Sequence, residues 1–407
     1  MNPSRRRFLK STGLGFLALG LPPSFLVRAA EAQQTDKRKV MVVVFQRGAM
    51  DGLNAVIPFK DPAYYTLRPS IAIPEPASEE GRVIDLDGFY GFHPALAPLK
   101  SLYDRGKLAI VHAAGSPDNT RSHFDAQDYM EIGTPGIKNT PDGWLNRYLA
   151  QEKNSGSPFR GVALTAQLPR ILAGRASALT VSSIDEFRLR NESMAGVLQK
   201  LYANTADTLF QSGGESLFAA MAQLHRVESR IPPSAERYPA GRFGASLAQI
   251  GRLIKADVGL EIAFTEIQGW DTHVNQGGAK GQMANRLKDL AEGLAAFSRD
   301  LGDRLEDVVL ITMSEFGRTA RENGNRGTDH GHANVMFALG GPVRGGKVYG
   351  RWPGLAPEVL YEGRDLDLTT DFRTVCGEVI AQHLGKRDLA KIFPGFRATS
   401  ASLGLIA

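Results

Sequence analysis

The sequence has only one cysteine, Cys376, among its 407 residues. A disulfide within the chain is therefore excluded, and the apolar run around Cys376 is typical of a buried position. Long hydrophobic stretches are also missing, since no segment after the N-terminus is apolar enough to span a membrane. The absence of internal repeats and low-complexity tracts, together with 43% hydrophobic and 22% charged residues, indicates an ordinary globular protein.

Strong charge of either sign is missing as well once the N-terminal segment is set aside. Residues 1–32 carry a net charge of +4 out of +5 for the whole chain, so residues 33–407 are nearly neutral. Binding to nucleic acid requires a basic stripe on the folded domain, and the composition of residues 33–407 does not indicate one. The sequence therefore predicts no nucleic-acid partner.

The basic residues of the N-terminal segment form a targeting signal. Residues 4–10 read Ser-Arg-Arg-Arg-Phe-Leu-Lys, an apolar run follows over residues 13–21, and residues 30–32 form a small-x-small cleavage site. Together these features predict a twin-arginine (Tat) signal peptide over residues 1–32, followed by a single domain over residues 33–407. The predicted location is periplasmic or secreted, and the Tat export machinery, which carries folded proteins, is a predicted partner.

Continuous apolar runs alternate with helical segments along the rest of the chain. Strands are predicted at Val40–Phe45, Leu108–Val111, Glu261–Ile267 and Val308–Thr312, with a helix near Ala95–Tyr103 and a long amphipathic helix over Met283–Leu301. This alternation is typical of an α/β fold with a mostly parallel central sheet flanked by helices. Residues from about 185 to 256 read mostly as helix, and we interpret them as a helical insertion in this domain.

Polar residues that can ligate metals lie after or near the predicted strands. They are Asp51, Asp271, His273, Glu315, Asp329, His330 and His332. Because the carboxyl ends of parallel strands share one edge of a sheet, we expect these side chains to meet there. Each cluster also has a simpler interpretation: an Asp-Gly turn at residue 51, a surface turn at 271–273, an ion pair of Glu315 with Arg318, and a solvated loop at 329–332. Together they favour a metal site.

Ser122 begins a Ser-x-x-Asp pattern that is typical of a helix N-terminus. We expect the serine to cap the helix, where the positive end of the helix dipole favours anions and an alkoxide. Beside a bound metal, its oxygen would be a candidate nucleophile at neutral pH. His123, which follows the serine, is ambiguous from the sequence. Four histidines outside the clusters are expected to be structural, namely His93, His112, His225 and His383.

Five motifs in a fixed order carry a family resemblance. They are Arg-Gly-Ala-Met-Asp-Gly-Leu-Asn at residues 47–54, Ser-His-Phe-Asp-Ala-Gln at 122–127, Gly-Trp-Asp-Thr-His at 269–273, Ser-Glu-Phe-Gly-Arg-Thr at 314–319 and Asp-His-Gly-His at 329–332. With these motifs the chain resembles the exported bacterial proteins of domain-of-unknown-function family 1501, over essentially the whole mature chain. That family in turn resembles a distant branch of the alkaline phosphatase and sulfatase superfamily, which implies an alkaline phosphatase-like core.

The resemblance also implies a ligand set for one or two divalent ions, chosen from Zn, Mn, Mg, Ca and Fe. One ion would lie among Asp51, Ser122 and Glu315. The other would lie among Asp271, His273 and one of His330 or His332, and Asp329 is a further candidate ligand. In this arrangement Ser122 would attack the phosphorus or sulfur of an anionic ester, while Arg121 or Arg318 would hold its equatorial oxygens.

The chain departs from the superfamily pattern at two points. Residues 315–317 read Glu-Phe-Gly where relatives have Asp-His-Gly, and Asp271 is closer to His273 than the corresponding pair in relatives. Either the metal pair is rearranged or one metal is lost. Formylglycine chemistry is not expected, because residues 122–126 lack a Cys/Ser-x-Pro-x-Arg motif.

Three classes of function follow from the sequence. The first is a metal-dependent hydrolase of small phosphate or sulfate esters. The second is a non-catalytic binding or assembly factor that keeps the hydrolase fold and works with an exported protein partner. The third is a metal-dependent enzyme of another class, such as a mutase or lyase.

Overall fold

The computed structural model of the chain describes residues 38–78, 80–151, 157–183, 218–221, 234–386, 388–397 and 402–407. The predicted signal peptide at residues 1–32 lies outside these ranges, as does most of the predicted helical insertion at about 185–256. Both therefore remain predictions. The unit that contains the sheet runs from Lys39 to Ala407.

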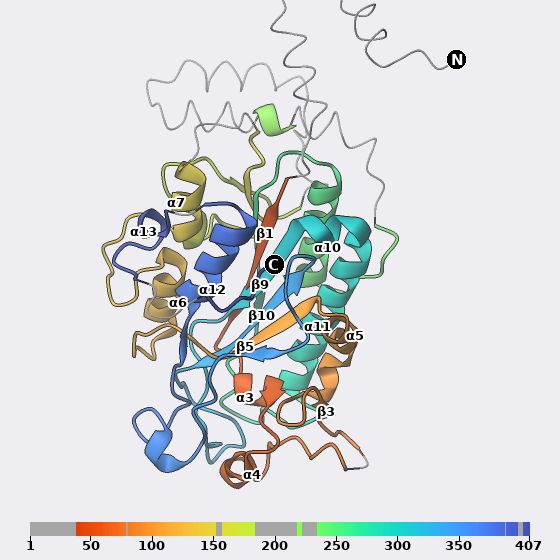
Figure 1. The fold of residues 1–407 in the computed structure, drawn as a ribbon, viewed down its shortest axis with the longest axis vertical. Helices are drawn as coiled ribbons and strands as arrows, with labels where there is room; N and C mark the ends of the chain where they lie inside the picture. The colour runs from red at the N-terminus through yellow and green to blue at the C-terminus, as the bar shows by residue number, and fades with distance from the viewer. Residues whose placement is uncertain are drawn as a thin grey trace, which may run out of the picture. The chain divides into compact units, whose positions relative to one another are not determined.

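A nine-stranded sheet runs through this unit (Figure 1). Its strands are β1 (Val40–Arg47), β5 (Leu108–Gly115), β6 (Gly161–Ala163), β7 (Leu179–Thr180), β8 (Ile262–Gln268), β9 (Val308–Met313), β10 (Asn334–Gly340), β11 (Val348–Tyr349) and β12 (Thr370–Asp371). They follow the order β11-β5-β10-β9-β1-β8-β6-β7, and β12 pairs with β5. Pairing is parallel except along β10, which is antiparallel to β5 and β9. The predicted mostly parallel sheet is confirmed.

The apolar runs explain why β1 and β9 lie at the centre of the sheet. Every residue of β9 is buried, and within β1 only Arg47 is partly exposed. Successive residues such as Val42 and Val43 pack into two separate cores on opposite faces of the sheet. A strand that is buried on both faces needs an apolar side chain at nearly every position, and these two runs supply it.

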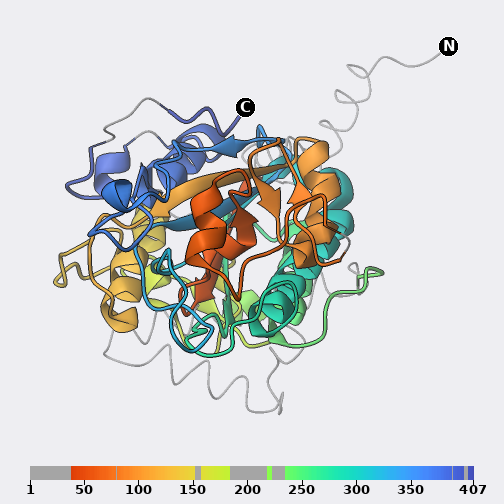
Figure 2. The same ribbon diagram turned by 90° about the horizontal axis from the view of Figure 1, so that it is seen from below.

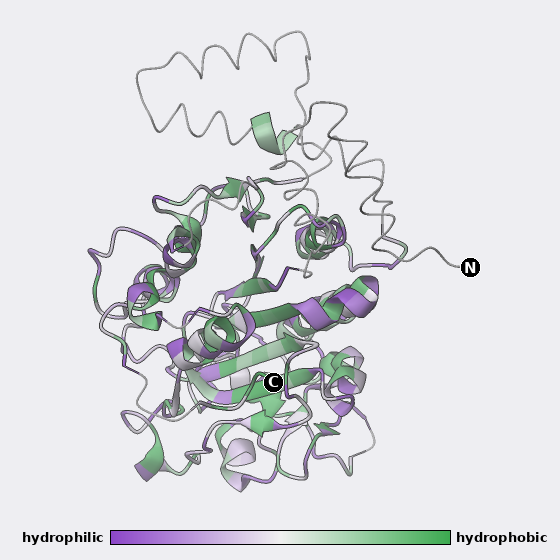
Figure 3. Ribbon diagram, turned by 45° about the horizontal axis from the view of Figure 1, so that its top comes forward, coloured by the Kyte–Doolittle hydropathy of each residue, from purple (hydrophilic) through white to green (hydrophobic). Residues whose placement is uncertain are grey.

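Helices cover both faces of the sheet (Figure 1). One face is covered by η1 (Pro94–Leu99), α5 (Lys100–Asp104), α10 (Arg242–Lys255) and α11 (Gln282–Leu301). The other is covered by α6 (His123–Ile132), α7 (Trp144–Ala150), α12 (Phe372–Glu378) and α13 (Leu389–Ile392). Further short helical segments are η2 (Arg170–Leu172), η4 (Gly302–Asp307), η5 (Pro357–Val359) and the π-helix η6 (Val379–His383). Figure 3 shows the apolar strands between helices that carry polar residues.

Of the two predicted helices, one is confirmed and the other is only partly a regular α-helix. The amphipathic helix over Met283–Leu301 is confirmed as α11, whose apolar residues face the core at spacings of three and four. The helix expected near Ala95–Tyr103 is instead a six-residue 3-10 segment, η1, followed by α5. Pro98 lies inside this segment and lacks the N–H group that a regular α-helix needs there, which explains why the first half is a 3-10 helix.

A second, antiparallel sheet follows β1 in the chain. It consists of β2 (Val56–Ile57), β4 (Gly91–Phe92) and β3 (Ile84–Asp85), and the short helices α3 (Gly52–Ala55) and α4 (Pro62–Leu67) lie in the same segment. Figure 2 looks at this end from below, with the red-orange segment after β1 surrounded by later parts of the chain. In the described part of the chain, no helix has the length and apolarity needed to cross a membrane.

Candidate metal centre

The loops that follow the parallel strands β1, β8 and β9 meet at one edge of the sheet. The N–H of Gly48, after β1, donates to Oε1 of Glu315, after β9, at 2.8 Å. The buried guanidinium of Arg318 donates to the carbonyl oxygens of Gly48 and Trp270 at 2.5 and 3.1 Å. It also donates to Oδ1 of Asp271 at 2.7 Å. Arg318 thus ties the loops after β1 and β8 to the loop after β9.

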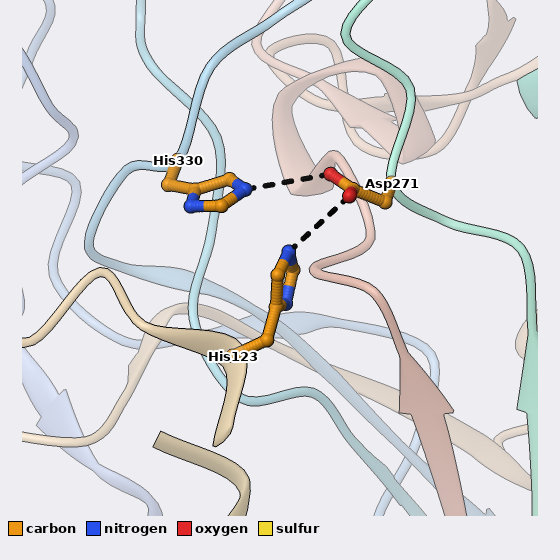
Figure 4. Close-up of side chains that lie close together, drawn as sticks. All are labelled: His123, Asp271 and His330. Carbon is orange, nitrogen blue, oxygen red and sulfur yellow. Dashed lines mark ion pairs between the residues drawn. The ribbon is translucent and has the colours of Figure 1, made fainter. Parts of the chain in front are cut away.

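The side chains of His123, Asp271 and His330 come together at this edge (Figure 4). They lie at the start of α6, after β8 and before β10, respectively. One ligand atom from each lies within 4.8 Å of the others. Asp271 Oδ2 is 3.5 Å from His123 Nε2, and Asp271 Oδ1 is 3.4 Å from His330 Nε2. The Asp271 side chain is 46% exposed, so the cluster is open to solvent.

Both imidazoles of this cluster are held through their Nδ1 atoms. His123 Nδ1 lies 2.8 Å from Glu315 Oε1, and His330 Nδ1 lies 2.7 Å from the carbonyl oxygen of Arg121. A carbonyl oxygen and an ionised carboxylate can only accept hydrogen bonds, so both Nδ1 atoms carry a proton. In the neutral ring, Nε2 then presents its lone pair to the cluster. The Nε2 atom of His123 is buried and has no hydrogen-bond partner among the described residues.

His273 adjoins the cluster on the side of His330. Its Nδ1 lies 3.0 Å from Asp329 Oδ1, and its Nε2 lies 3.0 Å from Asp271 Oδ1. The same Nε2 atom is 2.9 Å from Nε2 of His330. Two nitrogens that both present lone pairs repel each other at this distance unless a proton or a cation lies between them. Burial lowers the pKa of His330, so Nε2 of His330 is an acceptor in this contact.

This donor set fits a divalent cation. Imidazole nitrogens combined with carboxylate oxygen are ligands that Zn, Mn and Fe accept. Tetrahedral bonds of about 2.1 Å place neighbouring ligand atoms about 3.4 Å apart. The separations of 3.5 Å from Asp271 Oδ2 to His123 Nε2 and of 3.4 Å from Asp271 Oδ1 to His330 Nε2 lie near this value. Nε2 of His273 lies closer, at 2.9 Å from His330 Nε2 and 3.0 Å from Asp271 Oδ1. The hydrogen bonds at Nδ1 are also those that orient metal-binding histidines. His123, Asp271 and His330 could therefore hold a metal, with His273 as a fourth ligand.

Glu315 orients His123 and is not part of the three-residue group. Its Oε1 atom accepts hydrogen bonds of 2.8 Å from the N–H of Gly48, from Gln127 Nε2 and from His123 Nδ1. Burial would raise the pKa of Glu315, but the bonds from His123 and Gln127 lower it below the ordinary value. In turn, the bond to Glu315 raises the pKa of His123. Arg47 fixes the Gln127 amide by donating to its Oε1 at 2.9 Å.

The two solvent-facing carboxylates of the site are ionised at neutral pH. Partial burial would raise the pKa of Asp271, but the hydrogen bond and the positive charge of Arg318 lower it. The hydrogen bond from Asn323 lowers the pKa of Asp329. Both side chains therefore supply negative charge to a cation without first losing a proton.

Asp51 and Ser122, two of the predicted site residues, are engaged elsewhere. Oδ2 of the buried Asp51 accepts from Arg68 Nη1 at 2.6 Å and from Gln276 Nε2 at 2.7 Å. Ser122 is the exposed N-cap of α6, where its Oγ accepts from the N–H of Asp125 at 3.4 Å. The capping role agrees with the Ser-x-x-Asp pattern.

The two predicted substrate-binding arginines also have partners. Nη2 of Arg121 donates to Glu362 at 2.6 Å and to Asp365 at 2.7 Å. All three guanidinium nitrogens of Arg318 donate within the protein. Nε donates to the carbonyl oxygen of Ala49, Nη1 to that of Thr328, and Nη2 to the partners given above. Arg318 therefore positions loops, whereas Nε of Arg121 is buried without a hydrogen-bond partner among the described residues.

His332 points away from the cluster, unlike His330 two residues earlier. Its buried ring stacks on Tyr361, with 4.2 Å between the ring centroids and 20° between the planes. Burial lowers the pKa of His332. Of the two histidines that the sequence left as alternatives, the structure therefore places His330 in the three-residue group.

The sequence analysis did not assign a role to His123 or Gln127, although both lie in the motif at residues 122–127. The signal was their spacing: residues one and five positions after an N-cap lie on the same side of the first helical turns. His123 and Gln127 both reach Glu315 from that side of α6.

Comparisons with known proteins give a family and several remote structural likenesses. No curated protein matches the chain. The C-terminal periplasmic domain of EcEptC from Escherichia coli, in complex with Zn, has 10% identity and a TM-score of 0.36, with 75% of this chain and 73% of that chain covered. The lipoteichoic acid synthase LtaP from Listeria monocytogenes has 8% identity and a TM-score of 0.33, with 75% and 66% covered. PsFucS1 sulfatase from Pseudoalteromonas sp. has 13% identity and a TM-score of 0.34, with 79% and 66% covered.

The family comparison covers more than half of the chain. Residues 107–390 match the model described as "Protein of unknown function (DUF1501)", and the matched range contains four of the five motifs found in the sequence. The resemblance inferred from those motifs is confirmed, and the chain belongs to the DUF1501 family.

Proposed function

We propose that this protein is an exported, divalent-metal-dependent hydrolase that cleaves phosphate or sulfate esters of small anionic substrates. Its metal would be held by His123, Asp271, His330 and His273, and Ser122 would be the nucleophile. The twin-arginine pattern at residues 4–10 supports export by the Tat machinery to the periplasm or beyond.

One observation carries the proposal: the Nε2 atoms of His123 and His330 converge on the ionised carboxylate of Asp271, and Nε2 of His123 has no hydrogen-bond partner among the described residues. The Nδ1 protons of His123 and His330 are committed to Glu315 and to the Arg121 carbonyl. Their Nε2 atoms therefore face Asp271 as acceptors, and one of them is buried without a partner. A buried acceptor without a partner is costly, whereas a bound cation would satisfy the ligand atoms of His123, Asp271 and His330 at once.

The residues around the cluster have distinct chemical tasks. A bound divalent cation would act as a Lewis acid on the ester and neutralise its developing charge. Glu315 keeps His123 in the Nδ1-protonated form, and the carbonyl of Arg121 does the same for His330. Ser122 lies between Arg121 and His123 in the chain, at the N-terminus of α6, where the helix dipole favours an anionic oxygen. Ser122 is an exposed residue.

The test combines metal analysis with turnover. The purified chain is expected to contain a bound transition metal and to hydrolyse 4-nitrophenyl phosphate or 4-nitrophenyl sulfate. Ser122→Ala should lower kcat/KM by roughly 100-fold or more with the metal still bound. Ser101→Ala, at an exposed position of α5, is the matched control and should leave kcat/KM unchanged. A chain that binds no metal after incubation with Zn²⁺ or Mn²⁺ would contradict the proposal.

A binding or assembly factor is the second candidate, and one observation favours it. Phe124, directly after His123, is 89% exposed on the first turn of α6, which suits contact with an exported protein partner. Metal binding without turnover on either ester, combined with loss of partner binding in Phe124→Ser, would favour this candidate. Turnover that depends on Ser122 would favour the hydrolase.

A further inference from the structure

We infer that the chain binds one divalent cation rather than two, because the guanidinium of Arg68 occupies the place beside Asp51 that a second cation would need. The inference rests on the proposed metal site and specifies its stoichiometry. It disagrees with the arrangement that the family resemblance implies, in which Asp51, Ser122 and Glu315 surround a metal of their own.

The negative charge of Asp51 is balanced inside the protein by the buried guanidinium of Arg68. The Asp51 side chain is 1% exposed, and Oδ2 accepts from Arg68 Nη1 at 2.6 Å and from Gln276 Nε2 at 2.7 Å. The Gln276 amide is fixed in turn, because its Oε1 accepts from the hydroxyls of Thr272 and Thr328 at 2.8 Å each. One carboxylate oxygen of Asp51 is therefore fully committed to donors that stay protonated.

The other carboxylate oxygen of Asp51 does not form a metal site. Oδ1 is buried without a hydrogen-bond partner among the described residues. However, no two further ligand atoms of His, Cys, Asp or Glu gather around it within the described part of the chain. A tightly bound transition-metal ion needs several protein ligands, and a single carboxylate oxygen beside a guanidinium does not supply them.

Arg68 is built into this position. Its side chain is fully buried, and each of its three nitrogens donates a hydrogen bond. Nε donates to the carbonyl oxygen of Ala320 at 2.9 Å, Nη2 to that of Thr319 at 2.9 Å, and Nη1 to Asn54 at 2.7 Å in addition to Asp51. A guanidinium stays charged at any accessible pH, so this counter-charge is permanent, unlike a dissociable metal.

The remaining residues of the expected second site are also unsuited to a cation. Oε1 of Glu315 accepts three hydrogen bonds, and Oε2 accepts one from Ser314 Oγ at 3.1 Å. Ser122 has an exposed hydroxyl that caps α6. The three residues that would share the second metal therefore have other partners, whereas His123, Asp271 and His330 converge.

Metal stoichiometry tests the inference on the purified full-length chain. The chain is stripped with a chelator and titrated with Zn²⁺ by calorimetry, and bound metal is measured by elemental analysis. We expect one equivalent per chain. Mn²⁺ loading with electron paramagnetic resonance gives an independent readout, since a lone ion shows an isolated hyperfine pattern and a close pair shows a coupled spectrum.

Two variants locate the ion. His330→Ala should abolish tight binding, whereas Asp51→Asn should keep one equivalent with an affinity within about threefold of the wild type, because Asp51 lies outside the cluster. Two equivalents with a coupled Mn²⁺ spectrum would overturn the inference while leaving the proposed function standing. If Asp51→Asn does not fold, the wild-type stoichiometry and spectrum still decide. A chain that takes up no metal removes both the inference and the proposed function.

Discussion

A histidine side chain takes its role from the partner of each ring nitrogen. His330 gives its Nδ1 proton to a backbone carbonyl and turns Nε2 toward Asp271. His332 lies two residues further on, yet its ring is stacked on Tyr361 and buried away from the cluster. Gly331, which separates the two, packs against the backbone of Arg318. The Asp-His-Gly-His motif therefore contains one candidate ligand and one packing residue.

Substitution of these two histidines should separate metal binding from stability. His330→Ala is expected to weaken Zn²⁺ binding by at least about 100-fold, because it removes a nitrogen of the cluster. His332→Ala should leave Zn²⁺ affinity unchanged and lower the free energy of unfolding by about 1 kcal/mol through loss of the stacked pair. Calorimetric titration and denaturant unfolding of both variants check this. Loss of metal affinity in His332→Ala alone would contradict the assignment.

At the residue scale, the sequence predicted which motifs carry chemistry better than which atoms take part. Asp271, His273 and His330 could be anticipated, since each lies in a polar cluster near a strand end. His123 was left ambiguous, because its spacing to Gln127 places both residues on one side of α6 but does not tell which loop that side faces. The partner of Asp51 could not be predicted either, because Arg68 lies 17 residues further on, at the end of α4, and only the fold brings the two together.

At the scale of elements, close backbone contacts hold the loops after β9 and before β10 against each other. Residues Arg318 and His330 form an isolated antiparallel bridge, and the N–H of Gly331 donates to the carbonyl of Gly317 at 2.8 Å. A Cβ atom at Gly331 would lie 2.3 Å from the carbonyl carbon of Arg318. This space is too small for any side chain, so glycine there permits the approach that places His330.

Alanine at Gly331 should therefore disturb the site more than alanine elsewhere in the same loop. Gly331→Ala is expected to lower the free energy of unfolding by about 1–3 kcal/mol through overpacking and to weaken Zn²⁺ binding by roughly 10-fold. Gly324→Ala is the control, because a Cβ there meets nothing within 4 Å, and it should change neither quantity. Thermal unfolding and metal titration of the two variants give the comparison. Equal Zn²⁺ affinity in both would show that the close approach is not needed for the site.

Elements with a strong pattern were predictable, and those that depend on their surroundings were not. The continuous apolar runs of β1 and β9 and the spacing in α11 predicted these elements from local sequence alone. β10 is absent from the predicted strands, and its antiparallel direction depends on the course of the loop that contains His330. The strands β6, β7, β11 and β12 have only two or three residues each, which is too few for an alternating hydrophobic pattern to be recognised in the sequence.

Across the whole molecule, three histidines expected to be structural are buried in separate regions of the core. His112 on β5 lies 3.1 Å from the carbonyl oxygen of Val56, and His383 in η6 lies 3.1 Å from that of Val40. His93 lies 3.0 Å from the carbonyl oxygen of Gly278. Each hydrogen bond joins segments that are far apart in the chain, so protonation of these rings bears on global rather than local stability. The fourth, His225, lies outside the described residues.

Burial of neutral histidines should make the protein sensitive to mild acid. Burial lowers the pKa of His112 and of His383 to about 4, against an ordinary value of 6.5. Between pH 6.5 and 4 the unfolded chain binds more protons than the folded one, so the free energy of unfolding falls as the pH falls through this window. Each histidine is expected to contribute about 1–2 kcal/mol of this loss at about pH 5.

Denaturant unfolding at about pH 7.5 and about pH 5, with chelator present to remove bound metal, measures the effect. His112→Gln should be less stable than the wild type at the higher pH, because the packing and the bond to Val56 are disturbed. It should nevertheless lose about 1–2 kcal/mol less on acidification, since one buried group no longer takes up a proton on unfolding. Both proteins contain the same cluster histidines, so protonation of these rings contributes equally to the free energy of unfolding and drops out of the difference. An equal acid loss in the two proteins would show that His112 is not held neutral in the folded core.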